Sequence, residues 1–375
     1  MSPTHSALPP HRTWAEIDLG AIRHNAAAVR ARVGPGVKIM AIVKANAYGH
    51  GLGPVVRALA DRVDLFGVAN VAEARELRAH LPAAEVFILG PALPAERAEI
   101  VRAGFIPSVS NADEASAFGT LAGGAPVPIH FVVDSGMGRI GTWQDDALRV
   151  LAEVAALPGV KLAGLASHLP VADEDDAFTQ RQLAGFHALL AQARAAGLAL
   201  PLMHIENSAG LLEHPAQAGD LVRPGIMLYG ASPLPQWQHL LRPTLAWKTR
   251  ITLLREVGAG RGISYGRTFI TPRAMRIATL GVGYADGYQR HLTGRDAHVL
   301  IGGQRCAVLG RVTMDQILVD VSAPGAVATG DEVVLLGRQG DAEITVAELA
   351  EKAGTITWEI FTGLGPRVVR EYIGL

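Results

Sequence analysis

The stretch VKIMAIVKANAYGHG, residues 37–51, opens the part of the chain whose pattern decides the fold. Its first seven residues are almost continuously apolar, which is typical of a strand buried on both faces in a parallel sheet. The run ends at Lys44, and a segment rich in small and polar residues follows. This is the arrangement of an α/β protein that carries its polar groups at the carboxyl ends of its strands.

Similar apolar runs recur along the chain as far as residue 228. The eight runs are 37–43, 63–69, 85–90, 105–110, 129–134, 162–167, 202–206 and 221–228. Ala-rich stretches such as VAEARELRAHL (71–81) and DDALRVLAEVAAL (145–157) separate them, with apolar residues every three or four positions. Eight strand and helix units predict an α/β fold, a parallel (β/α)8 barrel of the TIM type inside a ring of helices.

The pattern changes after LRPTLAW (241–247) to short strands with period-two alternation and turns. One clear helical stretch, VAELAEKAG (346–354), interrupts it. We therefore expect the barrel over residues 12–242 and a separate, mainly β domain over 243–375, with residues 1–11 able to pack against the β domain.

The composition favours a cytoplasmic enzyme that acts on small molecules. Lys and Arg total 34 against 35 for Asp and Glu, so no excess of positive charge indicates a nucleic-acid or membrane partner. The single cysteine, Cys306, cannot form an intrachain disulfide and is typical of a small buried side chain in a reducing compartment. The start, MSPTHSALPPHRTW, has prolines and polar residues where a signal peptide has an apolar run, and no apolar segment is long enough to span a bilayer.

Polar residues follow several of the predicted strands directly. They are Lys44, residues 134–139, His168, Asn207, Ser208 and, within the eighth run, Arg223. Because a barrel of this type places its active site at the carboxyl ends of its strands, these positions predict one shared site. Lys44 by itself is compatible with a rim lysine on the surface or with a desolvated amine that serves as nucleophile and base.

The segment VKANAYGHG (43–51) resembles the lysine motif of the alanine racemases, a family of fold-type III enzymes that use pyridoxal 5'-phosphate (PLP). The resemblance covers nearly the whole chain, through DSGMGRIG (134–141), ASHLPVADE (166–174), ENSAG (206–210), VRPGIMLYG (222–230), ISYG (263–266), GYADGY (283–288), GRVTMDQ (310–316) and GPRVVR (365–370). It implies a Schiff base between PLP and Lys44, and interconversion of L- and D-alanine that supplies peptidoglycan synthesis.

The resemblance also implies two catalytic bases, one for each face of the α-carbon. Lys44 is one base, and Tyr265 of the partner subunit is the other, so the enzyme would be a homodimer with shared active sites. The pKa of a tyrosine is normally near 10, so Tyr265 needs activation to accept a proton. His168 would contact Tyr265 and connect it to Arg223.

The remaining cofactor contacts follow from the same resemblance. Arg223 would face the pyridine nitrogen, and because a guanidinium stays protonated it would leave that nitrogen unprotonated and make the ring a weaker electron sink. Tyr48, Ser208 and the backbone amides of Gly225 and Ile226 would hold the phosphate. His204 would support the ring or simply pack within its strand; Ser208 could instead cap a helix.

Substrate contacts are implied for three further residues. Arg139 and the backbone amide of Met314 would bind the carboxylate of the amino acid, and Tyr284 would narrow the entrance. The thirteen histidines show no zinc-ligand spacing, so we expect no catalytic metal.

The chain departs from the common family pattern at four positions. Val132 stands where many members have a lysine that can be carbamylated to brace the arginine, so something else must orient Arg139. Trp358 stands in place of a tyrosine, and Thr313 and Pro170 replace commoner Cys and Ala residues. Alanine remains the first substrate, with serine or a broader range as the alternative.

Two other functions are compatible with a barrel that binds PLP. A non-catalytic PLP carrier generally lacks the β domain that residues 243–375 predict here. A decarboxylase of the same fold would pair the pyridine nitrogen with an acidic residue, and Arg223 argues against that function.

Overall fold

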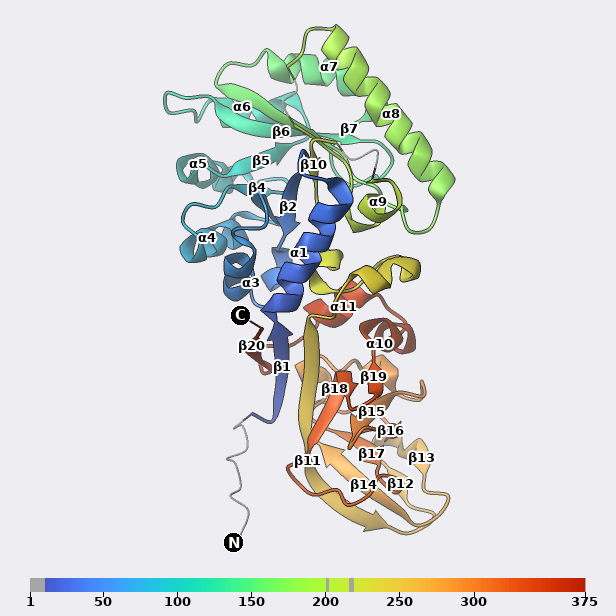
Figure 1. Cartoon of the computed structure of the whole chain (residues 1–375). Helices are drawn as coiled ribbons and strands as arrows, with labels where there is room; N and C mark the ends of the chain where they lie inside the picture. Colours follow the sequence, from blue (N-terminus) through green and yellow to red (C-terminus); the bar gives the residue numbers. More distant parts are fainter. Residues whose placement is uncertain (1–10, 200–201, 216–218, 375) are drawn as a thin grey trace. The chain divides into compact units, whose positions relative to one another are not determined.

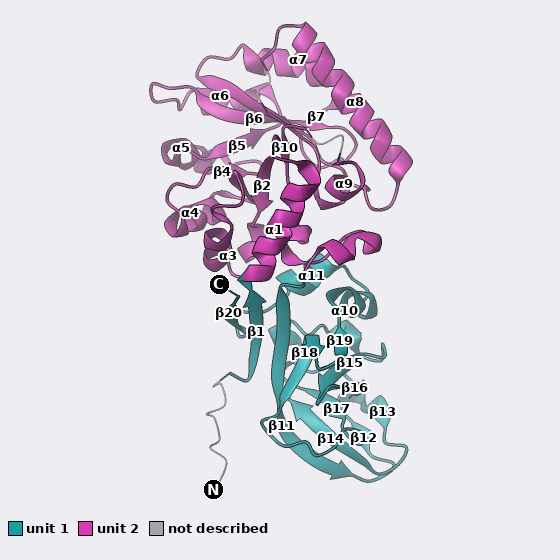
Figure 2. Cartoon of the chain, in the orientation of Figure 1, with its two compact units in different colours: residues 1–19, 243–375 teal, residues 20–242 magenta. Residues whose placement is uncertain are grey.

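The computed structural model describes residues 11–199, 202–215 and 219–374. The chain divides into two compact units, one of residues 20–242 and one that joins the described residues of 1–19 to those of 243–375 (Figures 1 and 2). Of the described helices, none is long and apolar enough to cross a membrane.

The unit of residues 20–242 is a nearly closed parallel barrel. Its eight strands are β10 (Leu221–Val222), β2 (Lys38–Ile42), β3 (Leu65–Val68), β4 (Val86–Ile88), β5 (Ile106–Val109), β6 (Val127–Asp134), β8 (Val160–Ala166) and β9 (Met203–His204), in that spatial order. Every neighbouring pair along this order is parallel. The ends meet where the Arg223 N–H donates to the Glu206 carbonyl at 3.1 Å. The predicted α/β barrel is confirmed.

Helices follow the strands and lie outside the sheet (Figure 1). They are α1 (Leu19–Val33), α2 (Lys44–Tyr48), α3 (Leu52–Leu59), α4 (Val71–His80), α5 (Pro94–Ala103), α6 (Ala112–Gly119), α7 (Gln144–Ala155), α8 (Asp176–Ala195) and α9 (Ser208–Glu213). The short strand β7 (Thr142–Trp143) pairs with β6 beside the barrel order. The predicted helices at 71–81 and 145–157 correspond to α4 and α7.

The eighth apolar run does not stay extended along its whole length. Only Leu221–Val222 is strand, and Ile226–Tyr229 forms the 3-10 turn η2. Pro224 has no N–H to donate to a ladder, and the chain turns at Gly225 directly after it. All four residues of η2 are buried, so their apolar character reflects burial rather than strand structure.

The second unit is built on a mainly antiparallel sheet. Its strands are β1 (Thr13–Asp18), β11 (Leu245–Val257), β14 (Met275–Leu280), β15 (His298–Ile301), β16 (Gln304–Leu309), β17 (Ile317–Asp320), β18 (Glu332–Gln339), β19 (Ala342–Ile344) and β20 (Val369–Ile373). Their order is β19-β18-β15-β16-β17-β14-β11-β1-β20, and an additional pairing of β18 with β11 closes a ring of strands. The mainly β C-terminal domain is thereby confirmed.

Short elements complete this unit. They are the ribbon of β12 (Gly262–Ile263) and β13 (Phe269–Ile270), the 3-10 turns η4 (Tyr265–Arg267), η5 (Tyr284–Asp286) and η6 (Arg290–Leu292), and the helices α10 (Val346–Ala353) and α11 (Thr357–Thr362). The helix expected at 346–354 corresponds to α10. α11 is an addition that the sequence pattern did not indicate.

Strand β1 bears on the boundary between the units. The expected range of 12–242 assigns it to the barrel, whereas β1 pairs antiparallel with β11 and parallel with β20. Its apolar side chains, Trp14 among them, are buried in the sheet of the second unit. We therefore propose residue 20 as the start of the barrel unit. The expected packing of residues 1–11 lies outside the described residues except for His11, whose carbonyl accepts from Arg250 Nε at 3.3 Å.

Candidate active site

A left-handed turn follows Lys44 at the carboxyl end of β2. Ala45, Asn46, Ala47 and Tyr48 all have φ between +52° and +55°. Left-handed helical backbone costs about 1–2 kcal/mol for each residue that carries a Cβ, so four in succession need strong local support. Part of it comes from Asn46, whose Oδ1 accepts the Leu52 N–H at 2.7 Å, and part from Gly49, whose N–H donates to the Ala45 carbonyl.

The Lys44 amine lies in a half-buried position among other cationic groups. Burial lowers the pKa of Lys44, the charge of Arg139 lowers it further, and the carboxylate of Glu73 opposes both effects. Arg139 itself is exposed, and the described residues offer it no hydrogen bond or ion pair. Lys44 therefore has the environment of an amine that loses its proton more easily than a surface lysine does.

Arg223 is buried and donates hydrogen bonds to groups on two neighbouring strand ends. Its Nη1 lies 2.5 Å from His204 Nδ1, and its Nη2 lies 2.5 Å from the Ser167 carbonyl and 3.2 Å from His168 Nδ1. Burial lowers the pKa of Arg223 to about 10, so the guanidinium is still charged at neutral pH. Burial and this charge lower the pKa of His168 to about 3, which keeps its imidazole neutral.

The network extends into the barrel through His130, which the sequence analysis did not single out. His130 on β6 is buried, and its Nδ1 lies 2.8 Å from His204 Nε2. Burial, followed by the charge of Arg223, lowers the pKa of His130 to about 3. Within the apolar run 129–134 only the polar side chain of a buried strand position could have indicated this contact.

A group of neutral hydrogen-bonding groups lies beside the end of β2. Ser208 Oγ accepts the Gly225 N–H at 3.0 Å and the Met227 N–H at 3.4 Å. A Cβ on Gly225 would lie 2.5 Å from Tyr48 Oη, so only glycine fits there. Burial raises the pKa of Tyr48 above its ordinary value, which leaves its hydroxyl as a neutral donor. Asn207, not Ser208, is the N-cap of α9, since its Oδ1 accepts the Ala209 and Gly210 N–H groups.

The other three predicted site residues lie on loops of the β unit. Tyr265 opens η4 between Ser264 and Gly266, both with positive φ, and the residue is 71% exposed. Tyr284 and Met314 are also exposed and lie on loops bonded to each other. The Tyr284 N–H donates to the Thr313 carbonyl, and the Ala285 N–H donates to the Met314 carbonyl, each at 3.0 Å.

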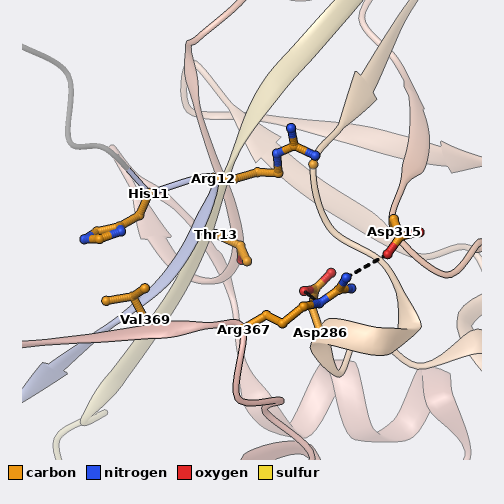
Figure 3. Close-up of a pocket in the computed structure, with 8 residues that line it drawn as sticks. His11, Arg12, Thr13, Asp286, Asp315, Arg367 and Val369 are labelled. Atoms are coloured by element: carbon orange, nitrogen blue, oxygen red, sulfur yellow. Dashed lines mark hydrogen bonds and ion pairs between the residues drawn. The ribbon is translucent and has the colours of Figure 1, made fainter.

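Arg367 forms ion pairs with both of these loops. The sequence patterns did not indicate this role, although Arg367 lies within GPRVVR. Its Nε pairs with Asp286 Oδ1 at 3.0 Å and its Nη1 donates to Asp315 Oδ1 at 2.8 Å (Figure 3). The buried Asp286 also accepts the Gly283 N–H at 2.9 Å. One guanidinium thus links the loop that carries Tyr284 to the loop that carries Met314.

The positions that depart from the family pattern have local explanations in part. Val132 is buried on β6 and can carry no charge toward Arg139. Thr313 Oγ1 donates to the Gln316 carbonyl at 2.7 Å and accepts the Gln316 N–H, so its hydroxyl shapes the turn before Met314. Trp358 is half-buried on α11, and Pro170 follows β8 in a half-buried loop.

The predicted residues thus fall into two groups, one in each unit. Those in the barrel unit are Lys44, Tyr48, Arg139, His168, His204, Ser208, Arg223, Gly225 and Ile226, and those in the β unit are Tyr265, Tyr284 and Met314. Across the residues that the structure describes, no three His, Cys, Asp or Glu side chains are grouped to hold a metal ion.

Comparison with known proteins gives matches over nearly the whole chain. Residues 17–233 match the family described as "Alanine racemase, N-terminal domain", and residues 244–372 match "Alanine racemase, C-terminal domain". The alanine racemase of Symbiobacterium thermophilum is 44% identical over 96% of this chain and 97% of its own. That of Halothermothrix orenii is 42% identical, over 96% of each chain.

Solved structures agree with these matches. An alanine racemase of Clostridium difficile 630 superposes with a TM-score of 0.91 at 32% identity, over 97% of this chain and 96% of that one. The biosynthetic alanine racemase of Pseudomonas aeruginosa gives a TM-score of 0.88 at 36% identity, over 97% and 99%.

Proposed function

The chain belongs to the alanine racemase family, and from this premise we propose that it interconverts L- and D-alanine with PLP as its cofactor. The observation that carries the proposal is the half-buried Lys44 amine at the end of a barrel strand, with a lowered pKa and Arg139 as a neighbouring charge. Such an amine suits both Schiff-base chemistry and proton transfer.

The residues of the barrel unit fit the cofactor. Ser208, Tyr48 and the amides of Gly225 and Ile226 would hold its phosphate, and the lack of a Cβ at Gly225 leaves the approach to Tyr48 Oη open. Arg223 would contact the pyridine nitrogen, and His204 would support the ring through Arg223. When bound, PLP supplies a carbonyl for the Lys44 amine and draws electrons from the α-carbon of the substrate.

Lys44 would take or return the α-proton on one face of the substrate. The lowered pKa of Lys44 increases the neutral fraction that a base needs at physiological pH. Tyr265 of the partner subunit would serve the other face, and its exposed position supports an approach from one subunit to another. His168 is neutral and its Nδ1 accepts from Arg223, so its proton lies on Nε2 and would be donated to Tyr265.

Arg223 favours a racemase over a decarboxylase. The guanidinium already donates to the imidazole of His204 and to two backbone carbonyls, and it can offer a further hydrogen bond without releasing a proton. Arg223 would therefore leave the pyridine nitrogen unprotonated. The β unit with its exposed Tyr265 likewise argues against a non-catalytic PLP carrier.

The substrate would be an amino acid whose carboxylate meets Arg139 and the Met314 amide, with Tyr284 at the entrance. Alanine is the first candidate, and serine or a broader range is the alternative because Trp358, Thr313 and Pro170 differ from the common pattern. The proposal includes a homodimer with shared sites, a role in supplying D-alanine for peptidoglycan, and a cytoplasmic location, which rests on the single buried Cys306.

The decisive experiment combines a spectrum with a substrate panel. Replacing Lys44 with Ala should abolish the visible absorbance of the lysine-bound cofactor and lower the rate at least about 10³-fold. Wild-type protein incubated with a panel of L-amino acids should yield D-alanine on chiral chromatography.

Lys38→Ala is the matched control, because Lys38 begins the same strand that Lys44 follows and its side chain is exposed. It should keep both spectrum and rate. An unchanged spectrum and rate in Lys44→Ala, or no D-enantiomer from any amino acid, would refute the proposed function.

A further inference from the structure

Two barrel helices begin with the same pair of reciprocal hydrogen bonds, a capping box. In α4, Asn70 Oδ1 accepts the Glu73 N–H at 3.1 Å and Glu73 Oε2 accepts the Ala69 N–H at 2.7 Å. In α6, Asn111 and Glu114 repeat both bonds, at 2.8 Å and 2.7 Å. Reciprocal bonds of this kind satisfy the free N–H groups at the start of a helix.

The second carboxylate oxygen distinguishes the two glutamates. Glu73 Oε1 accepts the N–H of Ala45 at 2.8 Å, which reaches back 28 residues to the position directly after Lys44. Glu114 Oε1 has no hydrogen bond to any of the residues that the structure describes. Helix capping therefore explains Glu114 completely and Glu73 only by half.

Ala45 is the point at which the backbone enters the left-handed turn. Within the turn, the N–H groups of Ala47 and Gly49 donate to the carbonyls of Val43 and Ala45. Of the described residues, only Glu73 accepts the Ala45 N–H. Because the turn is unfavourable for L-residues, the carboxylate at its first N–H is a contact that keeps it formed.

Glu73 also supplies the negative charge that faces Lys44. The other charged or titratable groups around this amine are Arg139 after β6 and His168 after β8, with Arg223 behind His168. The charge of Glu73 raises the pKa of Lys44 against the effects of burial and Arg139.

We propose that Glu73 is a positioning residue for Lys44: its carboxylate fixes the left-handed turn through the Ala45 N–H and so sets where the amine lies and what charge it faces. This inference rests on the proposed function for its meaning, since it concerns the base of that reaction. Its structural part can be tested without the cofactor.

The first test is amide hydrogen exchange of the apoprotein over residues 44–51. A Gln at this position has one acceptor oxygen for two N–H groups, so Glu73→Gln should speed exchange in this segment about tenfold, as the loss of one charge-assisted hydrogen bond predicts. Glu114→Gln loses the same negative charge but keeps the one acceptor oxygen that its capping contact needs, so it should leave the segment unchanged. Equal exchange in the two variants overturns the inference.

The second test separates charge from contact in the PLP-loaded enzyme. In Glu73→Gln the lysine-dependent limb of the pH profile should move to lower pH, because the charge that raises the pKa of Lys44 is lost, and kcat should fall more than KM rises. Glu73→Asp keeps the charge but is too short to reach both N–H groups. In this variant the lysine-dependent limb of the pH profile should stay in place, while amide exchange over residues 44–51 should become faster. If the lysine-dependent limb of the pH profile does not move in Glu73→Gln, the charge part of the inference is wrong.

The proposed function and the inference about Glu73 would be refuted by different results. If wild-type protein neither binds PLP nor racemises any amino acid, the proposed function fails while the exchange result still reports on the turn. If Lys44→Ala behaves as expected but Glu73→Gln matches Glu114→Gln in both readouts, the inference about Glu73 fails alone.

Discussion

Arg223 sets the protonation of the imidazoles around it. Because a guanidinium only donates, His204 Nδ1 must accept, and the proton of His204 then sits on Nε2 and points to His130 Nδ1. Burial lowers the pKa of both His130 and His204 well below neutrality. The network of Arg223 with His130, His168 and His204 therefore keeps one positive charge among neutral rings, which holds its hydrogen-bond directions constant across physiological pH.

Glu206 makes stability depend on pH. This carboxyl is fully buried next to the end of β9, its Oε1 has no hydrogen-bond partner among the residues that the structure describes, and burial raises its pKa from 4.5 to about 7. Between these two pKa values the folded protein keeps a proton on Glu206 that the unfolded chain releases. The contribution of Glu206 to the free energy of unfolding is therefore fully present below pH 4.5 and is lost as pH rises through about 7. Glu206→Gln should remove this pH dependence. Its free energy of unfolding, measured relative to wild type, should be higher at pH 8 than at pH 4.5 by on the order of 3 kcal/mol.

Denaturant unfolding at several pH values measures that difference. Glu76→Gln, on the exposed face of α4, is the control and should track wild type at every pH. Parallel curves for Glu206→Gln and wild type would show that the carboxyl is solvated in the folded state.

Among the elements, the turn after β2 stores backbone strain next to the reactive amine. Ala45 is exposed with φ +53° and ψ +51°, so its methyl group contributes strain without burial. Ala45→Gly should therefore stabilise the protein by about 1 kcal/mol, because glycine adopts this backbone without the Cβ penalty.

The matched control is Ala152→Gly on the exposed face of the regular helix α7. There the same substitution should destabilise by about 1 kcal/mol, since glycine is unfavourable in right-handed helix. Thermal unfolding of the two variants should shift in opposite directions; a shift in the same direction contradicts a strained turn at Ala45.

At the scale of the whole molecule, the predicted bases are divided between the two units, with Lys44 in one and Tyr265 in the other. If the partner subunit supplies Tyr265, a heterodimer of a Lys44→Ala chain and a Tyr265→Phe chain has one intact site and one doubly altered site. Such a heterodimer should recover about half of the wild-type rate, because a two-fold dimer carries two equivalent sites.

Co-expression of the chains with different tags allows the heterodimer to be isolated and assayed. Each homodimer should be nearly inactive while eluting at the same size as wild type. A heterodimer as inactive as its parents would show that Lys44 and Tyr265 act within one chain.

The sequence by itself determined the barrel and the β domain, and it predicted the positions of the site. Apolar runs report burial on both faces, and eight of them separated by amphipathic helices leave few other folds. The lysine, arginine and tyrosine motifs are contiguous segments, so their resemblance to a family can be read without coordinates.

Only the tertiary structure decided the contacts between distant segments. Three of these contacts join residues far apart in the chain. They are the hydrogen bond from Ala45 to Glu73, the pairing of β1 with β11, and the ion pairs of Arg367 with Asp286 and Asp315. The left-handed turn is equally hidden, because two of its four residues are alanines with no preference for it. Periodicity reports which side chains are buried, whereas the partner of a hydrogen bond depends on how strands and loops are brought together in space.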